Sequence, residues 1–449
     1  MKSLSQLVIL LAAIFSFATY PTDAASFRLE LADFGGAGEA GNPQGWHAWA
    51  PRAELQPRCY VDTAQFRSQP SALAISGNGK AAEYGGWGYR ASSIQSGRHY
   101  RLTAHYRTKA VSHEQLRVVA RLDWQDSSQK RVGYPDYAYL NQPAGEWKKV
   151  MLEAPAPEGA TGVRIELTLA WSPQGTVWWD DVVLEEITAP RPRPVRIGSV
   201  SLRPRQTGSK EGSVNAFLKA LDEVALGKPD IVCLGEGITL IGHNAGYASM
   251  AEAVPGPTTE RLGAKARQHH MYIVAGVYER EGDVLYNTAV LIDRQGHVAG
   301  KYRKVYLPRE EIEGGLTPGN GYPVFETDFG RIGMMICWDS QYADPARALA
   351  AKGAEIIFLP IWGGYSTLMQ ARALENHVYL VTAGYDCETA IYNPLGEALH
   401  STRESGVFKT VAVDLNHRFI EPWLGDMRGR FHKELRLDVP VIEDTSLLR

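Results

Sequence analysis

Three side chains in the second half of the chain could do chemistry together: a carboxylate, an ammonium and a thiol. Glu236 stands between two glycines directly after the apolar run 231–234, where a tight turn would leave its carboxylate little covered. Lys304 lies in an alternating, strand-like segment, and Cys337 ends the apolar run 332–337. A thiol with a pKa of about 8.5 is mostly protonated at neutral pH, so Cys337 would need a base or a cation beside it to act as a nucleophile.

The elements that must position these residues follow a regular order. Apolar runs typical of buried strands alternate with amphipathic segments typical of helices, which predicts an α/β layered domain with reacting groups at its strand ends. We expect strands at 195–200, 231–234, 272–277, 288–293, 332–337, 356–359, 378–383 and 407–414, and helices at 213–225, 258–269, 344–352 and 369–376.

Glu236, Lys304 and Cys337, in this order, resemble the nitrilase superfamily of carbon–nitrogen hydrolases, and the resemblance runs through residues 196–449. It is supported by Tyr302-Arg303-Lys304, by Cys337-Trp338-Asp339 and by the segments 316–319, 353–360 and 372–376. The resemblance implies an αββα sandwich that pairs with a second copy, as a homodimer or a higher homo-oligomer. It also implies that Cys337 is the nucleophile, Glu236 the general base and Lys304 the cation that stabilises the tetrahedral intermediate. The backbone N–H of Trp338 can help to hold the developing oxyanion.

Many members of this superfamily use a second glutamate between the lysine and the cysteine to position substrate or water. We expect Glu313 in this role, because it precedes two glycines and the 316–319 segment and lies close to the family spacing. Glu310 and Glu311 are the alternatives.

The residues around the cysteine bear on the reaction. Cys337-Trp-Asp-Ser-Gln-Tyr, followed by Ala-Asp-Pro-Ala-Arg347, resembles the N-carbamoyl amine amidohydrolases and aliphatic amidases and lacks the Cys-Trp-Glu of true nitrilases. We therefore expect hydrolysis of a small-molecule linear amide or N-carbamoyl amine through a Cys337 thioester, with release of ammonia or an amine. This chemistry needs no cofactor and no metal in the hydrolase domain. The alternatives are nitrile hydrolysis at the same site and a non-catalytic glycan-binding protein.

The first half of the chain, from residue 26 to residue 187, has a different pattern. Apolar and polar residues alternate in 100–106 and 163–169, and eight of the eleven tryptophans precede residue 190. Such alternation predicts an all-β antiparallel sandwich. The closing segment 175–186 resembles the last strand of jelly-roll carbohydrate-binding modules, which implies a glycan ligand and a structural calcium near Asp180 and Asp181. The alternatives are that these carboxylates cap turns, that the tryptophans fill the core, and that the domain serves only for attachment or oligomer contacts.

The remaining features set the boundaries and exclude several classes. A basic start, an apolar stretch and small residues near Ala24 predict a signal peptide at 1–24 and export to the periplasm or the extracellular space. A Pro-rich linker is expected at 188–195, followed by the hydrolase domain at 196–449. No stretch after the leader is long and apolar enough for a membrane span. Since the net charge is only −3, no cationic field favours binding to nucleic acid.

Overall fold

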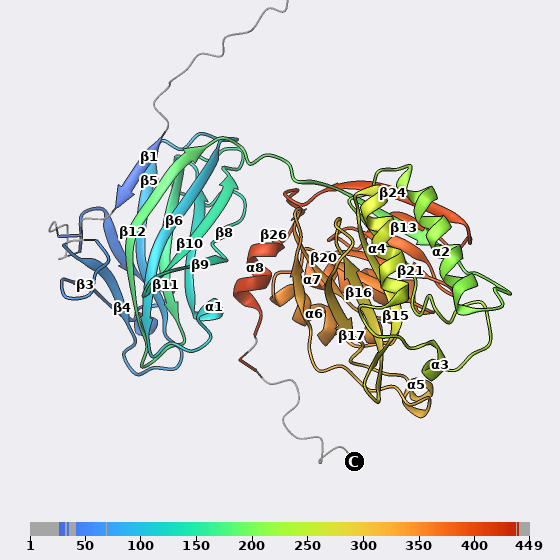
Figure 1. The fold of residues 1–449 in the computed structure, drawn as a ribbon. Helices are drawn as coiled ribbons and strands as arrows, with labels where there is room; N and C mark the ends of the chain where they lie inside the picture. Colours follow the sequence, from blue (N-terminus) through green and yellow to red (C-terminus); the bar gives the residue numbers. More distant parts are fainter. Residues whose placement is uncertain (1–26, 32–33, 36–41, 69, 437, 440–449) are drawn as a thin grey trace, which may run out of the picture.

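A computed structural model describes residues 27–31, 34–35, 42–68, 70–436 and 438–439 of the 449-residue chain. The segment expected to be a signal peptide lies outside these residues. Figure 1 shows two bodies, a β-sheet body formed by the first half of the chain and a mixed body of sheets and helices formed by the second. Among the described residues, no helix has the length and apolar character needed to cross a membrane.

The first body consists of two antiparallel sheets. One sheet has the strand order β3-β4-β12-β6-β10-β9, with β1 beside β12, and the other has the order β2-β5-β11-β7-β8. The first sheet contains β1 (Arg28–Leu31), β3 (Arg58–Asp62), β4 (Ala72–Ser76), β6 (His99–Lys109), β9 (Leu140–Ala144), β10 (Trp147–Pro155) and β12 (Thr176–Ile187). The second contains β2 (Trp46–Trp49), β5 (Tyr84–Ser92), β7 (Val118–Gln125), β8 (Asp136–Tyr137) and β11 (Gly162–Ala170).

Both sheets contribute to one hydrophobic core. The alternation read from the sequence is observed, because Tyr100, Leu102, Ala104 and Tyr106 of β6 all point into this core. Six of the tryptophans in this body are buried, namely Trp46, Trp87, Trp124, Trp147, Trp178 and Trp179. Four of them belong to this core, whereas Trp147 and Trp178 pack in a separate small cluster with Ala72 and Ala74. For the four core tryptophans, the structure agrees with the core-packing alternative rather than with an exposed sugar-stacking surface.

Asp180 and Asp181 lie at an irregularity in the pairing of β12 with β6. The Asp180 carboxylate accepts hydrogen bonds from the backbone N–H groups of Arg67, Ser68 and Asp181. The Asp181 carboxylate pairs with the guanidinium of Arg67. Among the described residues, no group of three or more His, Cys, Asp or Glu side chains is arranged to hold a metal ion. The structure therefore agrees with the alternative in which the carboxylates of Asp180 and Asp181 cap turns.

The second body has four layers. One six-stranded sheet has the order β17-β16-β15-β14-β13-β24, and the other has the order β18-β19-β20-β21-β22-β23. The first contains β13 (Pro194–Ser201), β14 (Ile231–Cys233), β15 (Tyr272–Glu281), β16 (Val284–Ile292), β17 (Val298–Arg303) and β24 (Val407–Asp414). The second contains β18 (Val324–Glu326), β19 (Arg331–Met334), β20 (Ile356–Ile361), β21 (Tyr379–Gly384), β22 (Thr389–Tyr392) and β23 (Ala398–Thr402).

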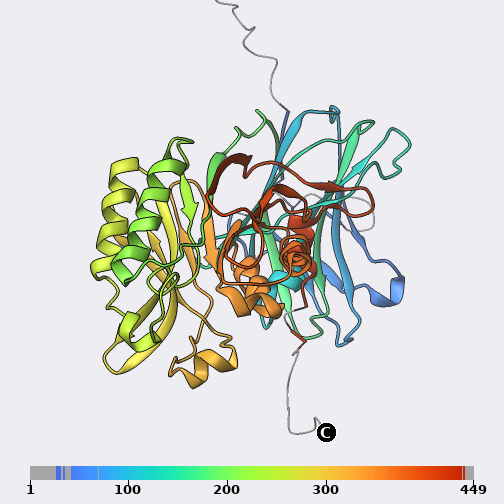
Figure 2. The same cartoon turned by 90° about the vertical axis from the view of Figure 1, so that its right-hand side faces the viewer.

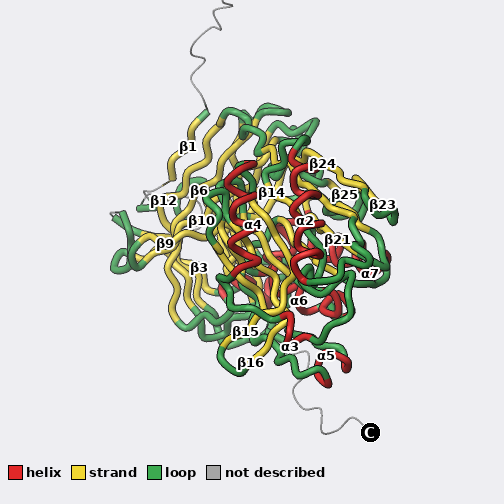
Figure 3. The backbone as a smooth tube through the Cα atoms, turned by 45° about the vertical axis from the view of Figure 1, so that its right-hand side comes forward, coloured by secondary structure: helices red, strands yellow, loops and turns green. Residues whose placement is uncertain are grey.

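A hydrophobic core lies between these two sheets, and a further core lies between each sheet and its helices. Helices α2 (Lys210–Ala225) and α4 (Pro257–His269) lie side by side across the first sheet (Figure 3). Helices α6 (Asp344–Ala351) and α7 (Ser366–Asn376) cover the second sheet on the opposite side (Figure 2). The prediction of an αββα sandwich is confirmed. The expected strands and helices are all present. The strands β17, β18, β22 and β23, and the short pair β25 (Ile420–Glu421) and β26 (Gly425–Asp426), are additional to the expected ones.

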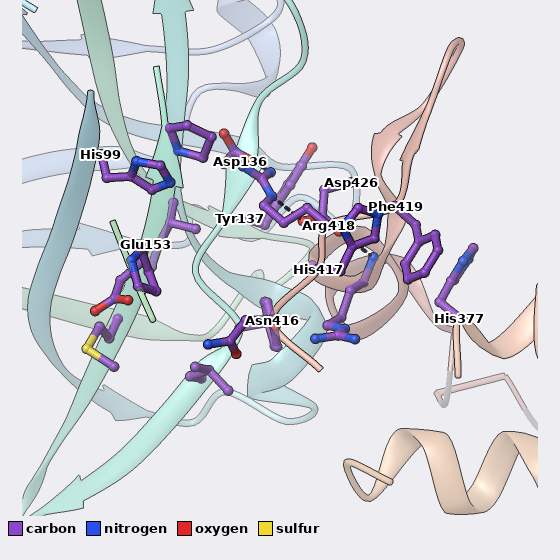
Figure 4. Close-up of a pocket in the computed structure, with 18 of the residues that line it drawn as sticks. His99, Asp136, Tyr137, Glu153, His377, Asn416, His417, Arg418, Phe419 and Asp426 are labelled. Carbon is purple, nitrogen blue, oxygen red and sulfur yellow. Dashed lines mark hydrogen bonds and ion pairs between the residues drawn. The ribbon is translucent and has the colours of Figure 1, made fainter. Parts of the chain in front are cut away.

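The end of the chain returns to the first body. Helix α8 (Met427–Glu434) lies between the two bodies (Figure 1), and the ammonium of Lys433 donates to the backbone carbonyl of Val118 over 3.0 Å. A cavity of about 410 Å³ is lined by residues of both bodies, and an ion pair within it joins Arg418 to Asp136 of β8 (Figure 4). The described part of the segment 196–449 thus contributes a helix to the boundary with the sandwich, which the sequence did not indicate.

Candidate active site

Each of the three residues follows a strand: Glu236 follows β14, Lys304 follows β17 and Cys337 follows β19. The carboxyl-terminal ends of β14 and β19 bring Glu236 and Cys337 to one edge of the double sheet. Glycines make the turn at Glu236 possible. Gly237 has a φ of +55°, which an L side chain rarely adopts, and a Cβ on Gly235 would lie 2.5 Å from the hydroxyl oxygen of Tyr385. That hydroxyl donates to the backbone carbonyl of Glu236 over 2.8 Å, which fixes the turn from the side of the second sheet.

The Lys304 ammonium stands between two buried carboxylates. Its Nζ donates to Oε1 of Glu236 and to Oε1 of Glu311, each over 3.0 Å, and only 1% of Lys304 is exposed. The side-chain amide of Asn287 in β16 donates to the same two oxygens, over 2.8 Å and 2.7 Å. We call Glu236, Asn287, Lys304 and Glu311 the active-site cluster. It holds two carboxylates and one cation.

The charges of this cluster shift the pKa values of two of its members. Burial alone would lower the pKa of Lys304, but the neighbouring charges of Glu236, Cys337 and Glu311 outweigh it and raise that pKa. Burial raises the pKa of Glu311, and the Glu236 carboxylate adds to this effect, while Lys304 opposes it. Lys304 is therefore a permanent cation at neutral pH, whereas Glu311 binds a proton more readily than an exposed glutamate.

Cys337 begins a short 3₁₀ turn, Cys337–Gln341, three residues after the end of β19. Its φ of +42° is unusual for a residue with a side chain and indicates local backbone strain. Burial raises the pKa of the Cys337 thiol to about 12, and Glu236 acts in the same direction, while Lys304 and the backbone at Trp362 and Gly363 oppose it. The resting thiol is thus protonated, and a base must remove its proton before it can attack.

Asp339 holds this strained turn in place. Its carboxylate accepts hydrogen bonds from the backbone N–H groups of Ile336 and Tyr306, each over 2.9 Å, and from the hydroxyl of Tyr302 over 2.7 Å. Burial raises the pKa of Asp339 to about 6. The sequence indicates Asp339 only as part of a motif, because Tyr302 and Tyr306 lie on a segment that the fold brings to it. Trp338, whose backbone N–H is the expected oxyanion donor, lies in the same turn.

The second glutamate of the cluster is Glu311 and not the expected Glu313. Both belong to the one-turn helix α5 (Arg309–Glu313), where residues two positions apart face nearly opposite sides. Glu313 is 61% exposed and pairs with Arg309 over 2.6 Å, and Glu310 is exposed as well. The two glycines after Glu313 mark the end of this helix, and they therefore indicate a boundary rather than a site residue. The sequence alone does not identify Asn287 as a site residue. The one signal that could have done so is its polar side chain in the mostly apolar strand β16.

Comparison with known proteins agrees with this arrangement. The family model described as carbon-nitrogen hydrolase matches residues 196–418. The omega-amidase of Xenopus tropicalis is 30% identical over 234 residues, which cover 46% of this chain and 85% of that protein. The chain belongs to the carbon–nitrogen hydrolase family. Its homologues include proteins named as amidases and nitrilases.

Other members of the carbon–nitrogen hydrolase family match a shorter part of the chain. A bifunctional nitrilase/nitrile hydratase of Lupinus angustifolius is 38% identical over 166 residues, covering 35% of this chain and 46% of that protein. The chain spans about half the length of the plant nitrilases that it matches. A carbon–nitrogen hydrolase structure from Helicobacter pylori G27 aligns with a TM-score of 0.46 and 21% identity, over 50% of this chain and 90% of that one.

Proposed function

We propose that this carbon–nitrogen hydrolase cleaves a linear amide or an N-carbamoyl amine through a thioester on Cys337. The observation that supports this most strongly is the position of Glu236. Its Oε1 is held by Lys304 and Asn287, while its Oε2 is buried and has no hydrogen-bond partner among the described residues. A buried acceptor without a donor, electrostatically coupled to a protonated thiol, is suited to remove that proton.

In the proposed reaction, Glu236 takes the proton of the Cys337 thiol as sulfur attacks the carbonyl carbon of the substrate. The carbonyl π electrons move to oxygen, and Lys304 and the backbone N–H of Trp338 hold the resulting oxyanion. When the oxyanion collapses, the C–N bond breaks, and the nitrogen leaves as ammonia or an amine with the proton from Glu236. Water then loses a proton to Glu236, attacks the thioester and releases a carboxylic or carbamic acid, and the thiol recovers its proton.

We assign to Glu311 the part of the second glutamate, the positioning of substrate or water. It faces Lys304 from the side of α5, and its raised pKa suits a group that exchanges hydrogen bonds with a neutral amide or a water molecule. Glu313 has no part in this proposal because its side chain points away from the cluster.

The substrate class is tested by measuring ammonia or amine release from matched panels of linear amides, N-carbamoyl amines and nitriles. We expect turnover of at least one amide or N-carbamoyl compound and its loss in Cys337→Ala. Cys59→Ala, which alters a partly buried thiol of the sandwich, is the matched control and should keep full activity. Preference for nitriles would favour the alternative reaction, which the plant and archaeal homologues named as nitrilases support. Undiminished turnover in Cys337→Ala would contradict the thioester.

We further propose that residues 26–187 form a jelly-roll accessory domain joined by the 188–195 linker to a hydrolase domain at 196–449. The strand orders β4-β12-β6-β10 and β5-β11-β7-β8 support this. Apart from the step from β7 to β8, successive strands of this set alternate between the two sheets, as in two Greek keys. A glycan is the proposed ligand of this domain. Binding of the purified protein to a glycan array tests this, and failure to bind any saccharide would leave only the structural role.

Export to the periplasm or beyond and assembly into a homodimer or a higher homo-oligomer complete the proposal. Export is supported by the composition of residues 1–24, and amino-terminal sequencing of the protein from culture fractions tests it; recovery of Met1 would contradict it. Sedimentation of the purified enzyme tests the dimer, and a monomer at all concentrations would contradict it.

A further inference from the structure

The Asn287 side chain lies between the two carboxylates of the active-site cluster and touches both. Asn287 is fully buried in β16, and its Nδ2 lies 2.8 Å from Oε1 of Glu236 and 2.7 Å from Oε1 of Glu311. Carboxylate oxygens only accept hydrogen bonds, so the amide must present its NH2 group to them, one hydrogen to each. The backbone carbonyl of Asn287 also accepts the N–H of Lys304 over 2.9 Å, which aligns the lysine with the pair.

These donors are distributed unequally over the oxygens of Glu236. Asn287 and Lys304 both donate to Oε1, and Oε2 has no partner among the described residues. Lys304 has three N–H groups, of which the two hydrogen bonds to Glu236 and Glu311 use two. Oε2 of Glu311 also has no hydrogen-bond partner among the described residues, but it lies 3.0 Å from the Lys304 ammonium. One ammonium hydrogen and the Oε2 atoms of the two carboxylates therefore remain for the thiol and the substrate.

We propose that Asn287 is a positioning residue that makes Oε2 of Glu236 the proton acceptor and keeps Glu236 and Glu311 ionised together beside a single cation. This inference rests on the proposed function, because it concerns how the base of that reaction is held.

The electrostatics of the pair explain why such a donor is needed. Two carboxylates that share a buried site repel each other, and a proton relieves the repulsion by binding to one of them. A neutral amide donates to both without adding a charge, so it stabilises the ionised pair while Lys304 keeps its charge for the oxyanion. A second cation in this place would compete with the substrate for the base.

The other titratable groups around the pair do not replace this donor. The charge of Glu236 or Glu311 contributes to the pKa shift of each of these groups. They are Tyr247 of α3 (Tyr247–Met250), Tyr278 of β15, Lys304, Cys337, Tyr385 and Cys387. The Tyr385 hydroxyl is directed to the backbone carbonyl of Glu236 rather than to its carboxylate. Among the described residues, only Asn287 and Lys304 donate to both carboxylates.

The test is the pH dependence of catalysis in variants that remove the donor. Asn287→Leu keeps the size of the side chain and has no donor, while Asn287→Ser and Asn287→Ala are similar in size and differ by one hydroxyl. We expect kcat of Asn287→Leu to fall by about 10²-fold, with KM changed less than about threefold. The acidic limb of kcat/KM should move to higher pH by about one unit, because the pair takes up a proton more easily without the amide. The limb of Asn287→Ser should lie between those of the wild type and Asn287→Ala.

A second readout does not depend on finding the substrate. The rate at which iodoacetamide alkylates Cys337, followed by mass spectrometry of its peptide, should show the same displaced limb in Asn287→Leu and Asn287→Ala. The matched control is Asn376→Leu, since Asn376 is also buried but donates to the Arg372 carbonyl within α7. The acidic limb of the Cys337 alkylation rate in Asn376→Leu should coincide with that of the wild type.

The outcomes separate this inference from the proposed function. Activity that falls in the Asn287 variants with an unmoved acidic limb in both readouts would overturn the inference and assign Asn287 to packing alone. Lack of turnover with any amide, N-carbamoyl compound or nitrile would refute the proposed function, but a displaced alkylation limb would still support the positioning role. If Asn287→Leu fails to fold, the comparison of Asn287→Ser with Asn287→Ala decides.

Discussion

Buried charge is used in two different ways in the two bodies of this molecule. The five-stranded sheet of the sandwich carries ion pairs on its outer face, formed by Arg121, Asp123, Arg131, Arg164 and Glu166, which we call the sheet-face cluster. Its two carboxylates are covered by three guanidiniums. The active-site cluster also has two buried carboxylates, but it has a single cation.

The arrangement of partners makes the difference clear. In the sheet-face cluster, one oxygen of Glu166 pairs with Arg121 and the other with Arg164 over 2.5 Å. Asp123 is likewise shared, between Arg131 over 2.5 Å and Arg164 over 3.2 Å. Every carboxylate oxygen there faces a guanidinium, whereas Oε2 of Glu236 faces none. Carboxylates whose oxygens are all paired with guanidiniums hold strands together. Proton transfer instead requires a carboxylate oxygen that is still able to accept a hydrogen bond.

Replacement of Lys304 by Met should have the largest effect. The substitution leaves two buried carboxylates without a cation, so we expect turnover to fall by more than about 10³-fold and the free energy of unfolding by about 3–5 kcal/mol. Because the carboxylates can neutralise themselves by binding protons, the stability deficit should shrink as the pH falls. Urea unfolding at pH 5 and pH 8, with ammonia release at pH 8, measures both. A deficit that grows on acidification would contradict the assignment of charges.

Replacement of Glu311 by Gln comes next, and Glu313→Gln is its matched control on the same helix. We expect Glu311→Gln to lower kcat by about 10²-fold, because a carboxylate that faces Lys304 and substrate becomes a neutral amide. Glu313→Gln should keep wild-type kcat, since its partner Arg309 is exposed at the surface. Equal losses in the two variants would remove Glu311 from the active-site cluster.

The sequence predicted more about the fold than about the contacts within the site. Strand–helix alternation and apolar runs are local signals, so the αββα layers and the positions of Glu236 and Cys337 after apolar strands could be read directly. The choice between Glu311 and Glu313 depended on the phase of a single helical turn, which has too few residues for a periodic pattern. Asn287 and Asp339 act through partners on distant segments of the chain, such as Glu311 and Tyr302, and no pattern within one segment reveals such pairs.

The same limit applies to the boundary between the bodies. Helix α8 combines Phe431 and His432 with four charged residues, and its composition does not indicate that it packs against another body. His432 stacks on Tyr139 with ring centroids 5.1 Å apart, and Lys433 inserts its ammonium toward Val118. Burial of Lys433 depends on a tertiary contact between residues more than three hundred positions apart in the chain, and it could not be foreseen.

Within the sheet-face cluster, Glu166→Gln should cost about 3 kcal/mol of unfolding free energy without changing kcat. Glu166 is 0% exposed and balances two guanidiniums, and its removal leaves both with less negative charge. Chemical denaturation followed by tryptophan fluorescence measures the loss, because buried tryptophans are concentrated in the sandwich. A parallel loss of kcat in the folded variant would show that the two clusters are coupled.

The Lys433→Met variant tests an unpaired cation at the boundary. Burial lowers the pKa of Lys433 to about 8. Lys433 is 4% exposed, and among the described residues its ammonium donates only to the Val118 carbonyl. The unfolded chain therefore binds more protons than the folded one between about pH 8 and pH 10.5, and stability should rise with pH across this window. In Lys433→Met this part of the rise should disappear, by about 2–3 kcal/mol between pH 7 and pH 10. Melting temperatures at pH 7 and pH 10 measure it, and an unchanged slope would contradict the buried state of the ammonium.

The smallest effect is expected from Arg131→Gln at the rim of the sheet-face cluster. Arg131 is 50% exposed, so water already screens its pair with Asp123, and Arg164 still covers the other oxygen of that carboxylate. We expect a loss of no more than about 1 kcal/mol, which 1 M salt should largely abolish. Denaturation curves of Arg131→Gln and Glu166→Gln in low and high salt provide the comparison. If Arg131→Gln cost as much as Glu166→Gln, the sheet-face cluster would not be saturated, and its contrast with the active-site cluster would fail.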